Sequence, residues 1–181
     1  MKFVETPLKD AWLIEPQAIA DERGFFARVW CSEELHEAGL STEIAQISIA
    51  HNRYKGTIRG MHYQREPHQE TKVVRCLSGS VLDVIIDIRE QSTTYLQWTS
   101  VELDAERRNA LYIPGGFAHG YQTLEDSTEM EYLISCPYAP DFAGGLRYDD
   151  PHLAIDWPLD PSIVSDRDQH WDLISIDQSI R

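Results

Sequence analysis

The chain has 181 residues and carries 16 Lys and Arg against 30 Asp and Glu, a formal net charge of −14. Its 42% hydrophobic content is typical of a soluble globular protein, and we expect residues 1–181 to form a single domain. So acidic a chain lacks the basic surface needed to bind nucleic acid or an anionic membrane, and neither partner is expected. A small anionic ligand is still compatible with this charge if a few cations cluster.

Targeting and redox signals are also informative. The sequence has no run of about 18 apolar residues that could cross a bilayer. Its first residues lack the apolar stretch of a signal peptide. Cys31, Cys76 and Cys136 are odd in number and widely spaced, which favours free thiols in a reducing compartment. A cytoplasmic location is therefore expected.

Short strands separated by turns containing Gly or Pro dominate the predicted secondary structure. We predict strands at residues 44–50, 57–64, 71–77, 81–89, 98–103, 110–113 and 129–135. A helix is expected at 32–39, where Ser32 can cap the start and Gly39 can end it, and a second at 168–173, after Ser165. Many short strands at this spacing indicate an all-β sandwich or jelly roll. The proline-rich C-terminal part is expected to wrap over the sheets.

Polar side chains stand in several of the apolar strands. Period-two alternation places His62 on the face opposite Met61. Lys72 shares a face with Val74, where an amine costs free energy unless it is paired or functional. Each of these residues, and Tyr132 likewise, has an ordinary structural interpretation when taken alone. Together, a base, a cation and a phenol in strands that line one cavity indicate proton-transfer chemistry.

The segments around His62 and His119 loosely resemble the two metal-binding motifs of cupins. In a metal-binding cupin a second histidine stands where this chain has Gln64, and the carboxylate position matches poorly. Two imidazoles without further ligands make a weak zinc or iron site. We therefore expect no metal and no cofactor. If the protein were instead a metal-dependent oxygenase, the purified protein would contain bound iron.

Further motifs follow in a fixed order from about residue 20 to residue 170. They include Asp21-Glu22-Arg23-Gly24-Phe25-Phe26, Arg59-Gly60-Met61-His62-Tyr63-Gln64, Lys72-Val73-Val74-Arg75, Gly115-Gly116-Phe117-Ala118-His119-Gly120-Tyr121, Glu131-Tyr132 and Ser165-Asp166-Arg167-Asp168. In this order they resemble the nucleotide-sugar 3,5-epimerases of the cupin superfamily, typified by dTDP-4-dehydrorhamnose 3,5-epimerase. The resemblance implies a cupin-type double-stranded β-helix, or jelly roll, with a few short helices.

The resemblance also implies an activity, namely inversion at C3, C5 or both of a nucleoside-diphosphate-linked 4-keto-6-deoxy sugar. These carbons flank the carbonyl, so removal of their protons gives an enolate. By resemblance, His62 is the general base, and Asp168 or, as a second candidate, Asp83 supports its imidazolium. Lys72 would stabilise negative charge on the 4-oxygen. Tyr132 would return a proton from the opposite face of the ring.

The resemblance assigns further residues to substrate binding. Arg23 and Arg59 are the candidates for the diphosphate, because a guanidinium offers a planar fork to phosphate oxygens. The other matched positions are Phe26, Gln46, Ser48, His119 and Tyr138. In the family the strand that carries Arg23 often reaches the neighbouring subunit's site, which implies a homodimer.

Some positions depart from the family pattern. Arg28 stands where the family often has a carboxylate, Ser48 where it often has Asn, and residues 50–56 include one extra residue. These positions lie in the nucleotide-facing region, so GDP-, CDP- and UDP-linked keto sugars stay open besides dTDP-linked ones. A 3,4-ketoisomerase and a non-catalytic sugar-nucleotide-binding cupin are further alternatives. Tyr132 and the long tail through Asp168 favour the epimerase.

Overall fold

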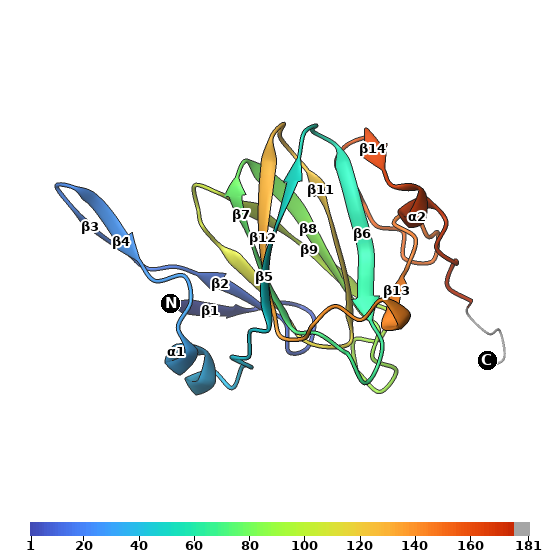
Figure 1. Cartoon of the computed structure of the whole chain (residues 1–181), viewed down its shortest axis with the longest axis horizontal. Helices are drawn as coiled ribbons and strands as arrows, with labels where there is room; N and C mark the ends of the chain where they lie inside the picture. Colours follow the sequence, from blue (N-terminus) through green and yellow to red (C-terminus); the bar gives the residue numbers. More distant parts are fainter. Residues whose placement is uncertain (176–181) are drawn as a thin grey trace.

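The computed structural model describes residues 1–175, which form a sandwich of two antiparallel sheets (Figure 1). The first sheet contains, in spatial order, β1 (Lys2–Glu5), β2 (Trp12–Glu15), β10 (Ala110–Ile113), β7 (Lys72–Ser78), β12 (Thr128–Ile134) and β5 (Gln46–Asn52). The second contains β13 (Ala143–Gly145), β6 (Thr57–Gln64), β11 (Phe117–Thr123), β8 (Ser80–Asp87) and β9 (Trp98–Asp104), and β14 (Ile163–Val164) adds in parallel to β6. The predicted all-β class is confirmed.

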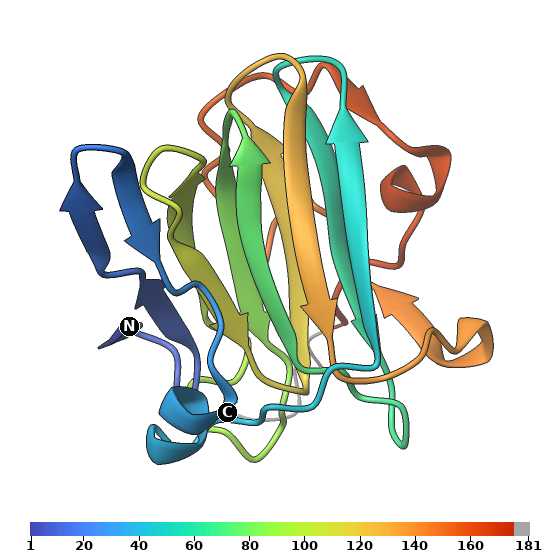
Figure 2. The ribbon, with the colours of Figure 1, turned by 60° about the vertical axis from the view of Figure 1, so that its left-hand side comes forward.

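A third, two-stranded element consists of β3 (Ala18–Asp21) and β4 (Gly24–Ala27). This hairpin projects from the body of the molecule in Figure 1 and stands beside the sandwich in Figure 2. All four residues of β3 are exposed, as are the first three of β4. The hairpin thus has little cover from its own chain; the guanidinium of Arg108 lies 4.3 Å from the centroid of the Phe25 ring.

Every predicted strand is present, with ends within two residues of those expected. The sequence analysis missed β1 to β4, β11, β13 and β14. The omission of β11 has a physical reason: it lies between β6 and β8, and all its residues are buried. It buries the polar His119 and Gln122 as well as apolar residues, so it shows no alternation of polar and apolar side chains.

The first helix, α1 (Ser32–Glu37), lies at the predicted place. The expectation that Ser32 caps it is wrong, because the residue at the cap is Cys31, which makes no side-chain hydrogen bond there. Gly39 ends the helix as expected, with a φ of 74° that only glycine adopts freely, and its N–H donates to the carbonyl of His36.

The second helix, α2 (Asp166–Gln169), begins earlier and is shorter than the predicted 168–173. Ser165 is its cap, and the Ser165 hydroxyl accepts a hydrogen bond from the backbone N–H of Asp168 at 3.1 Å. The cap fixes the helix start one residue after Ser165. A short 3-10 helix, η1 (Pro140–Phe142), precedes β13. No helix within residues 1–175 is long and apolar enough to cross a membrane.

The main hydrophobic core lies between the two sheets, and a further cluster covers the outer face of the second sheet. The outer cluster contains Met61, Val84, Ile86, Ala118 and Leu153, with Leu146, Ile155 and Trp157 packed against it. The indole N–H of Trp98 in β9 ties the tail to this sheet by donating to the carbonyl of Leu153 at 2.7 Å. Within the tail, the indole N–H of Trp157 donates to the carbonyl of Tyr148 at 2.8 Å. The predicted wrapping of the C-terminal part over a sheet is confirmed.

Candidate active site

An irregularity in β6 shapes the site. His62 pairs with His119 across the β6–β11 ladder, whereas Arg59, three residues earlier, pairs with Tyr121 only two residues further on. The extra residue in β6 is a β-bulge, which brings Arg59 and His62 to the same cavity. A Cβ at Gly60 would lie 2.5 Å from the Cα of Gly120, so this close approach of two backbones requires glycine.

A cavity of about 350 Å³ lies where this part of β6 faces the first sheet. Its lining residues are Gln46, Ser48, Ile49, Ala50, Arg59, His62, Glu70, Lys72, His119, Tyr132, Ile134 and Tyr138. Arg59, His62 and His119 belong to the second sheet, whereas Lys72 and Tyr132 belong to the first. The structure thus brings together all the predicted site residues except Asp168, Arg23 and Phe26.

Asp168 lies directly behind His62. The Nε2 atom of His62 is 2.6 Å from Oδ1 of Asp168, and the backbone N–H of Gly60 donates to Oδ2 at 3.3 Å. Burial alone would raise the pKa of Asp168, but the hydrogen bonds from His62, Gly60 and Ser165 outweigh it and hold that pKa below its usual value. An ionised Asp168 fixes Nε2 as the protonated nitrogen, which leaves Nδ1 of the half-exposed His62 ring available as a base.

The second candidate partner for His62, Asp83, has a different role. Both its carboxylate oxygens contact Nε2 of His119, at 3.0 and 2.8 Å, and both side chains are buried. Burial raises the pKa of Asp83, and the neighbouring His119 opposes that rise. The His119 ring meets that of Tyr132 edge-on, with 6.0 Å between centroids. The pair therefore supports the wall of the cavity beside Tyr132, and the structure leaves Asp168 as the partner of His62.

Lys72 points into the interior, as its place among apolar residues predicts, and is only 6% exposed. Its ammonium contacts Oε1 of Glu70 at 2.8 Å, and the other oxygen of Glu70 accepts from Nε2 of Gln64 at 3.1 Å. The ion pair with Glu70 offsets part of the cost of burying the ammonium of Lys72 at the cavity. The sequence analysis did not include Glu70 in the site, although its spacing of two residues from Lys72 was the available signal.

Tyr132 lies on the wall opposite His62. Burial is the main reason why the pKa of Tyr132 stands well above its usual value, and the nearby hydroxyl of Tyr121 raises it further. Tyr132 is therefore a neutral phenol with a proton to give at any physiological pH. The sequence analysis missed Tyr121, and it also missed Asn52, which contacts both Arg59 and Tyr121.

Two predicted binding residues lie outside the cavity of their own chain. Arg23 and Phe26 lie on the β3–β4 hairpin, where the Arg23 side chain is 85% exposed and paired with Asp21, and Phe26 is 70% exposed. Of the two substituted positions that depart from the family pattern, Ser48 lines the cavity. Arg28 does not, because its guanidinium binds Glu34 at 2.7 Å.

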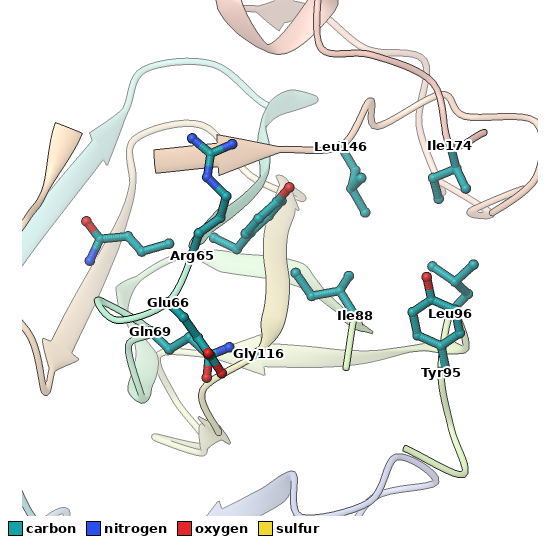
Figure 3. A pocket seen from close by; sticks show the side chains of 11 residues that line it. Arg65, Glu66, Gln69, Ile88, Tyr95, Leu96, Gly116, Leu146 and Ile174 are labelled. Carbon is teal, nitrogen blue, oxygen red and sulfur yellow. The ribbon is translucent and has the colours of Figure 1, made fainter. Parts of the chain in front are cut away.

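A second hollow of about 370 Å³ lies beside β6, next to Tyr63 (Figure 3). Its polar side chains, Arg65, Glu66 and Gln69, lie on one side of the view, and apolar side chains, Ile88, Leu96, Leu146 and Ile174, on the other. Its lining includes Arg65 and Glu66 but neither an imidazole nor an amine, so it lacks counterparts of His62 and Lys72. Within residues 1–175, no group of three or more His, Cys, Asp and Glu side chains converges as a metal site would require.

The chain matches, over residues 5–175, the family model described as dTDP-4-dehydrorhamnose 3,5-epimerase. The protein belongs to this family. A dTDP-4-dehydrorhamnose 3,5-epimerase of Methanothermobacter thermautotrophicus is 39% identical over 173 residues, which cover 94% of this chain and 92% of that one. The enzyme of that name in Escherichia coli K12 is 34% identical over 183 residues, with coverages of 100% and 97%.

Solved structures of the epimerase family show the same fold. The enzyme of Bacillus anthracis, with TDP and PPi bound, superposes with a TM-score of 0.92 at 36% identity and covers 96% of this chain and 99% of its own. The Legionella pneumophila enzyme in complex with dTDP-4-keto-L-rhamnose gives 0.88 at 35% identity, with coverages of 95% and 92%. A 3′-monoepimerase of Streptomyces bikiniensis in complex with dTDP-quinovose gives 0.86 at 34%, with coverages of 93% and 85%. These similarities confirm the predicted family and jelly-roll fold.

Proposed function

We propose that this protein is an isomerase that inverts C3 and C5 of dTDP-4-dehydro-6-deoxyglucose through an enolate. The observation that carries the proposal is the placement of His62 and Tyr132 in opposing sheets, on the two walls of one cavity that Lys72 also lines. A base and an acid on opposite sides of a sugar ring turn proton exchange into inversion. The family membership and the ligands of solved relatives agree with this chemistry.

The reaction begins with proton removal by His62. Its Nδ1 takes the proton from the carbon beside the carbonyl, and Asp168 stabilises the imidazolium that forms. Because Asp168 is buried and held by several donors, its carboxylate keeps the imidazole in one orientation. The electron pair of the broken C–H bond moves to the 4-oxygen of the sugar.

Lys72 acts on that oxygen. Its ammonium is nearly excluded from water, so its interaction with a developing negative charge is much stronger than in bulk solvent. Glu70 anchors the amine by an ion pair at 2.8 Å. Tyr132 then gives its proton to the carbon from the opposite side, which forms the new C–H bond and leaves a phenolate that solvent reprotonates.

The nucleotide assignment rests on the relatives. The structures named above hold TDP in the Bacillus anthracis enzyme, dTDP-4-keto-L-rhamnose in the Legionella pneumophila enzyme and dTDP-quinovose in the Streptomyces bikiniensis enzyme. Arg59 supplies a cation for the diphosphate within an otherwise acidic chain. Ser48 lines the cavity, whereas Arg28 does not. Within a single chain, Ser48 is therefore the substituted position that can affect which nucleotide base is recognised. GDP-, CDP- and UDP-linked sugars are the alternatives.

We also propose a homodimer in which the β3–β4 hairpin completes the site of the second copy. Arg23 and Phe26 do not reach the cavity of their own chain, and the apolar face of Phe26 is exposed. The edge strand β5, which borders the cavity, exposes Ile47 and Ile49, each at 61%. A second copy seated on this edge would cover these apolar side chains. The expected cytoplasmic location remains a prediction, which fractionation of the source cell would check.

Proton NMR in D2O with nucleotide-linked 4-keto-6-deoxyglucose tests the proposal. We expect deuterium to enter at both C3 and C5 of the dTDP-linked sugar, with slower exchange on the GDP-, CDP- and UDP-linked forms. His62→Ala should abolish exchange, whereas His36→Ala, which removes an imidazole in α1 far from the cavity, should not. Exchange at C3 alone would make the protein a monoepimerase, and a 3-keto product would indicate the ketoisomerase. If no substrate exchanged its protons while the sugar nucleotides still bound, the protein would be a non-catalytic sugar-nucleotide-binding protein.

A further inference from the structure

Gln64 is a buried amide that the proposed mechanism does not use. It ends β6, its exposed fraction is 4%, and it does not line the cavity that contains His62 and Lys72. A buried amide is costly unless its hydrogen bonds are made, so its partners indicate what it does. The partners of Gln64 come from two segments, residues 68–70 and residues 137–139.

The orientation of the Gln64 amide follows from these partners. Its Oε1 accepts from the backbone N–H of Ala139 at 2.6 Å, and only an acceptor can occupy that place. Its Nε2 therefore faces oxygens that can only accept, namely the carbonyl of His68 and Oε2 of Glu70, both at 3.1 Å, and the carbonyl of Pro137 at 3.4 Å. The flipped amide would place its own oxygen against these acceptors. Gln64 is thus a hydrogen-bond donor to Glu70.

The Glu70 carboxylate has a donor at each of its oxygens. Oε1 contacts the Lys72 ammonium at 2.8 Å, and Oε2 receives the hydrogen bond from Gln64. The Glu70 side chain is 11% exposed and lines the cavity in which the proposed reaction forms a negative charge. An oxygen of Glu70 that turned toward the cavity would repel this charge, and the ammonium would lose its fixed place. The hydrogen bond from Gln64 opposes that rotation.

We infer that Gln64 is a positioning residue for Lys72 and that it acts through Glu70. The inference rests on the proposed function, in which Lys72 stabilises the negative 4-oxygen of the sugar. Gln64 holds the carboxylate in one orientation, and the carboxylate holds the ammonium at the cavity. Because these contacts exist before the substrate binds, the ammonium does not have to be reoriented during the reaction. The position at which a metal-binding cupin has a histidine thus serves in this chain to hold a lysine.

NMR can test this contact without substrate, because three of the four lysines are exposed whereas Lys72 is buried. In protein labelled with 13C at lysine Cε, Lys72→Met identifies the signal of the buried lysine by its disappearance. Gln64→Met keeps the length of the side chain and removes both polar ends, so we expect it to move this signal and to leave the other three in place. Gln69→Met, the same change at an exposed neighbour at the second hollow, is the matched control and should move none of them.

Steady-state kinetics tests the consequence for the reaction. Gln64→Met should lower kcat about tenfold, as expected for one hydrogen bond to a charged group, and should leave KM and the Kd for dTDP unchanged. In Glu70→Gln, the new amide oxygen faces the Lys72 ammonium and its nitrogen meets the nitrogen of Gln64, so the hydrogen bond between the two side chains is already lost. Adding Gln64→Met to that variant should therefore cost nothing further in kcat. Equal losses in the two backgrounds would mean that Gln64 supports only the fold, and would overturn the inference.

The two measurements together separate this inference from the proposed function. A moved Lys72 signal in a protein that exchanges no proton of any keto sugar would refute the proposed function and still establish that Gln64 holds Lys72. A Lys72 signal that Gln64→Met leaves in place would refute the inference whatever the activity. If Gln64→Met also moved the signals of the exposed lysines, its fold would have changed. Gln64→Asn, whose amide is one methylene too short to reach Glu70, would then be measured with the same two outcomes.

Discussion

Individual side chains in the cavity act through their partners. Asp168 contacts one nitrogen of His62, which leaves the other for the proposed role as a base, and Glu70 pairs with the buried ammonium of Lys72. Asp83 is also a buried carboxylate, but it contacts His119 rather than His62. The assignment of each acid to its histidine therefore depends on geometry rather than on residue type.

Asp168→Asn should lower kcat by about 10²- to 10³-fold, because the imidazolium of His62 loses its carboxylate and an amide can present the wrong group to Nε2. KM should change little, since Asp168 does not line the cavity. Steady-state kinetics would check this, with Asp166→Asn in the same helix as the control. A variant with wild-type kcat would show that His62 works without Asp168.

Gln64 bears on the expectation that no metal takes part. Its Oε1 accepts from the backbone N–H of Ala139 at 2.6 Å and its Nε2 donates to Glu70, so both ends of the amide are engaged. We expect overnight dialysis against EDTA to leave the rate of proton exchange unchanged. A loss of activity that zinc or iron restores would contradict the expectation.

At the scale of elements, one buried carboxylate fixes the loop that follows β8. Asp87 ends β8 with no exposed surface and accepts from Ser92 at 2.5 Å, Thr94 at 2.6 Å and the guanidinium of Arg89. Arg89 in turn contacts Asp10 at 2.8 Å, which joins the loop after β8 to the N-terminal segment. Burial alone would raise the pKa of Asp87, but these donors outweigh it and lower the pKa to about 2.

Asp87→Asn should therefore destabilise the protein at pH 7 by about 2 kcal/mol, the linkage value of such a shift. Because the folded-state pKa lies below the unfolded one, this stability is present above about pH 4 and is lost as the pH falls toward 2. Urea unfolding at pH 7 and at pH 2.5 would show the gap between wild type and variant closing in acid. Glu90→Gln, an exposed neighbour in the same loop, is the control; a constant gap at both pH values would contradict the assignment.

At the scale of the whole molecule, the exposed hairpin lies away from the cavity of its own chain. The hairpin carries Arg23 and Phe26 away from the site, whereas the resemblance assigns both to the substrate. The proposed homodimer, with the hairpin of one copy at the site of the other, would reconcile these facts.

Mixed subunits would test that assembly. Arg23→Ala and His62→Ala should each be weakly active or inactive alone, whereas dissociated and reassembled mixtures should regain activity. In a mixed dimer, the copy with intact His62 receives an intact Arg23 from its partner if the hairpin acts between subunits. Light scattering would confirm the dimer. Mixtures no more active than their components would show that Arg23 serves its own chain or none.

The sequence alone determined the fold class, the strands with regular alternation and the residue types at the site, because burial imposes periodicity on apolar side chains and chemistry restricts the polar ones. His62, Lys72 and Tyr132 were predicted in this way, with the resemblance supplying their roles. Only the tertiary structure decided which partner each residue has. Asp168 and His62 meet across 106 positions of chain, and Asn52 and Tyr121 across 69. No local pattern encodes such contacts, since they arise from how the sheets face each other and where the tail returns.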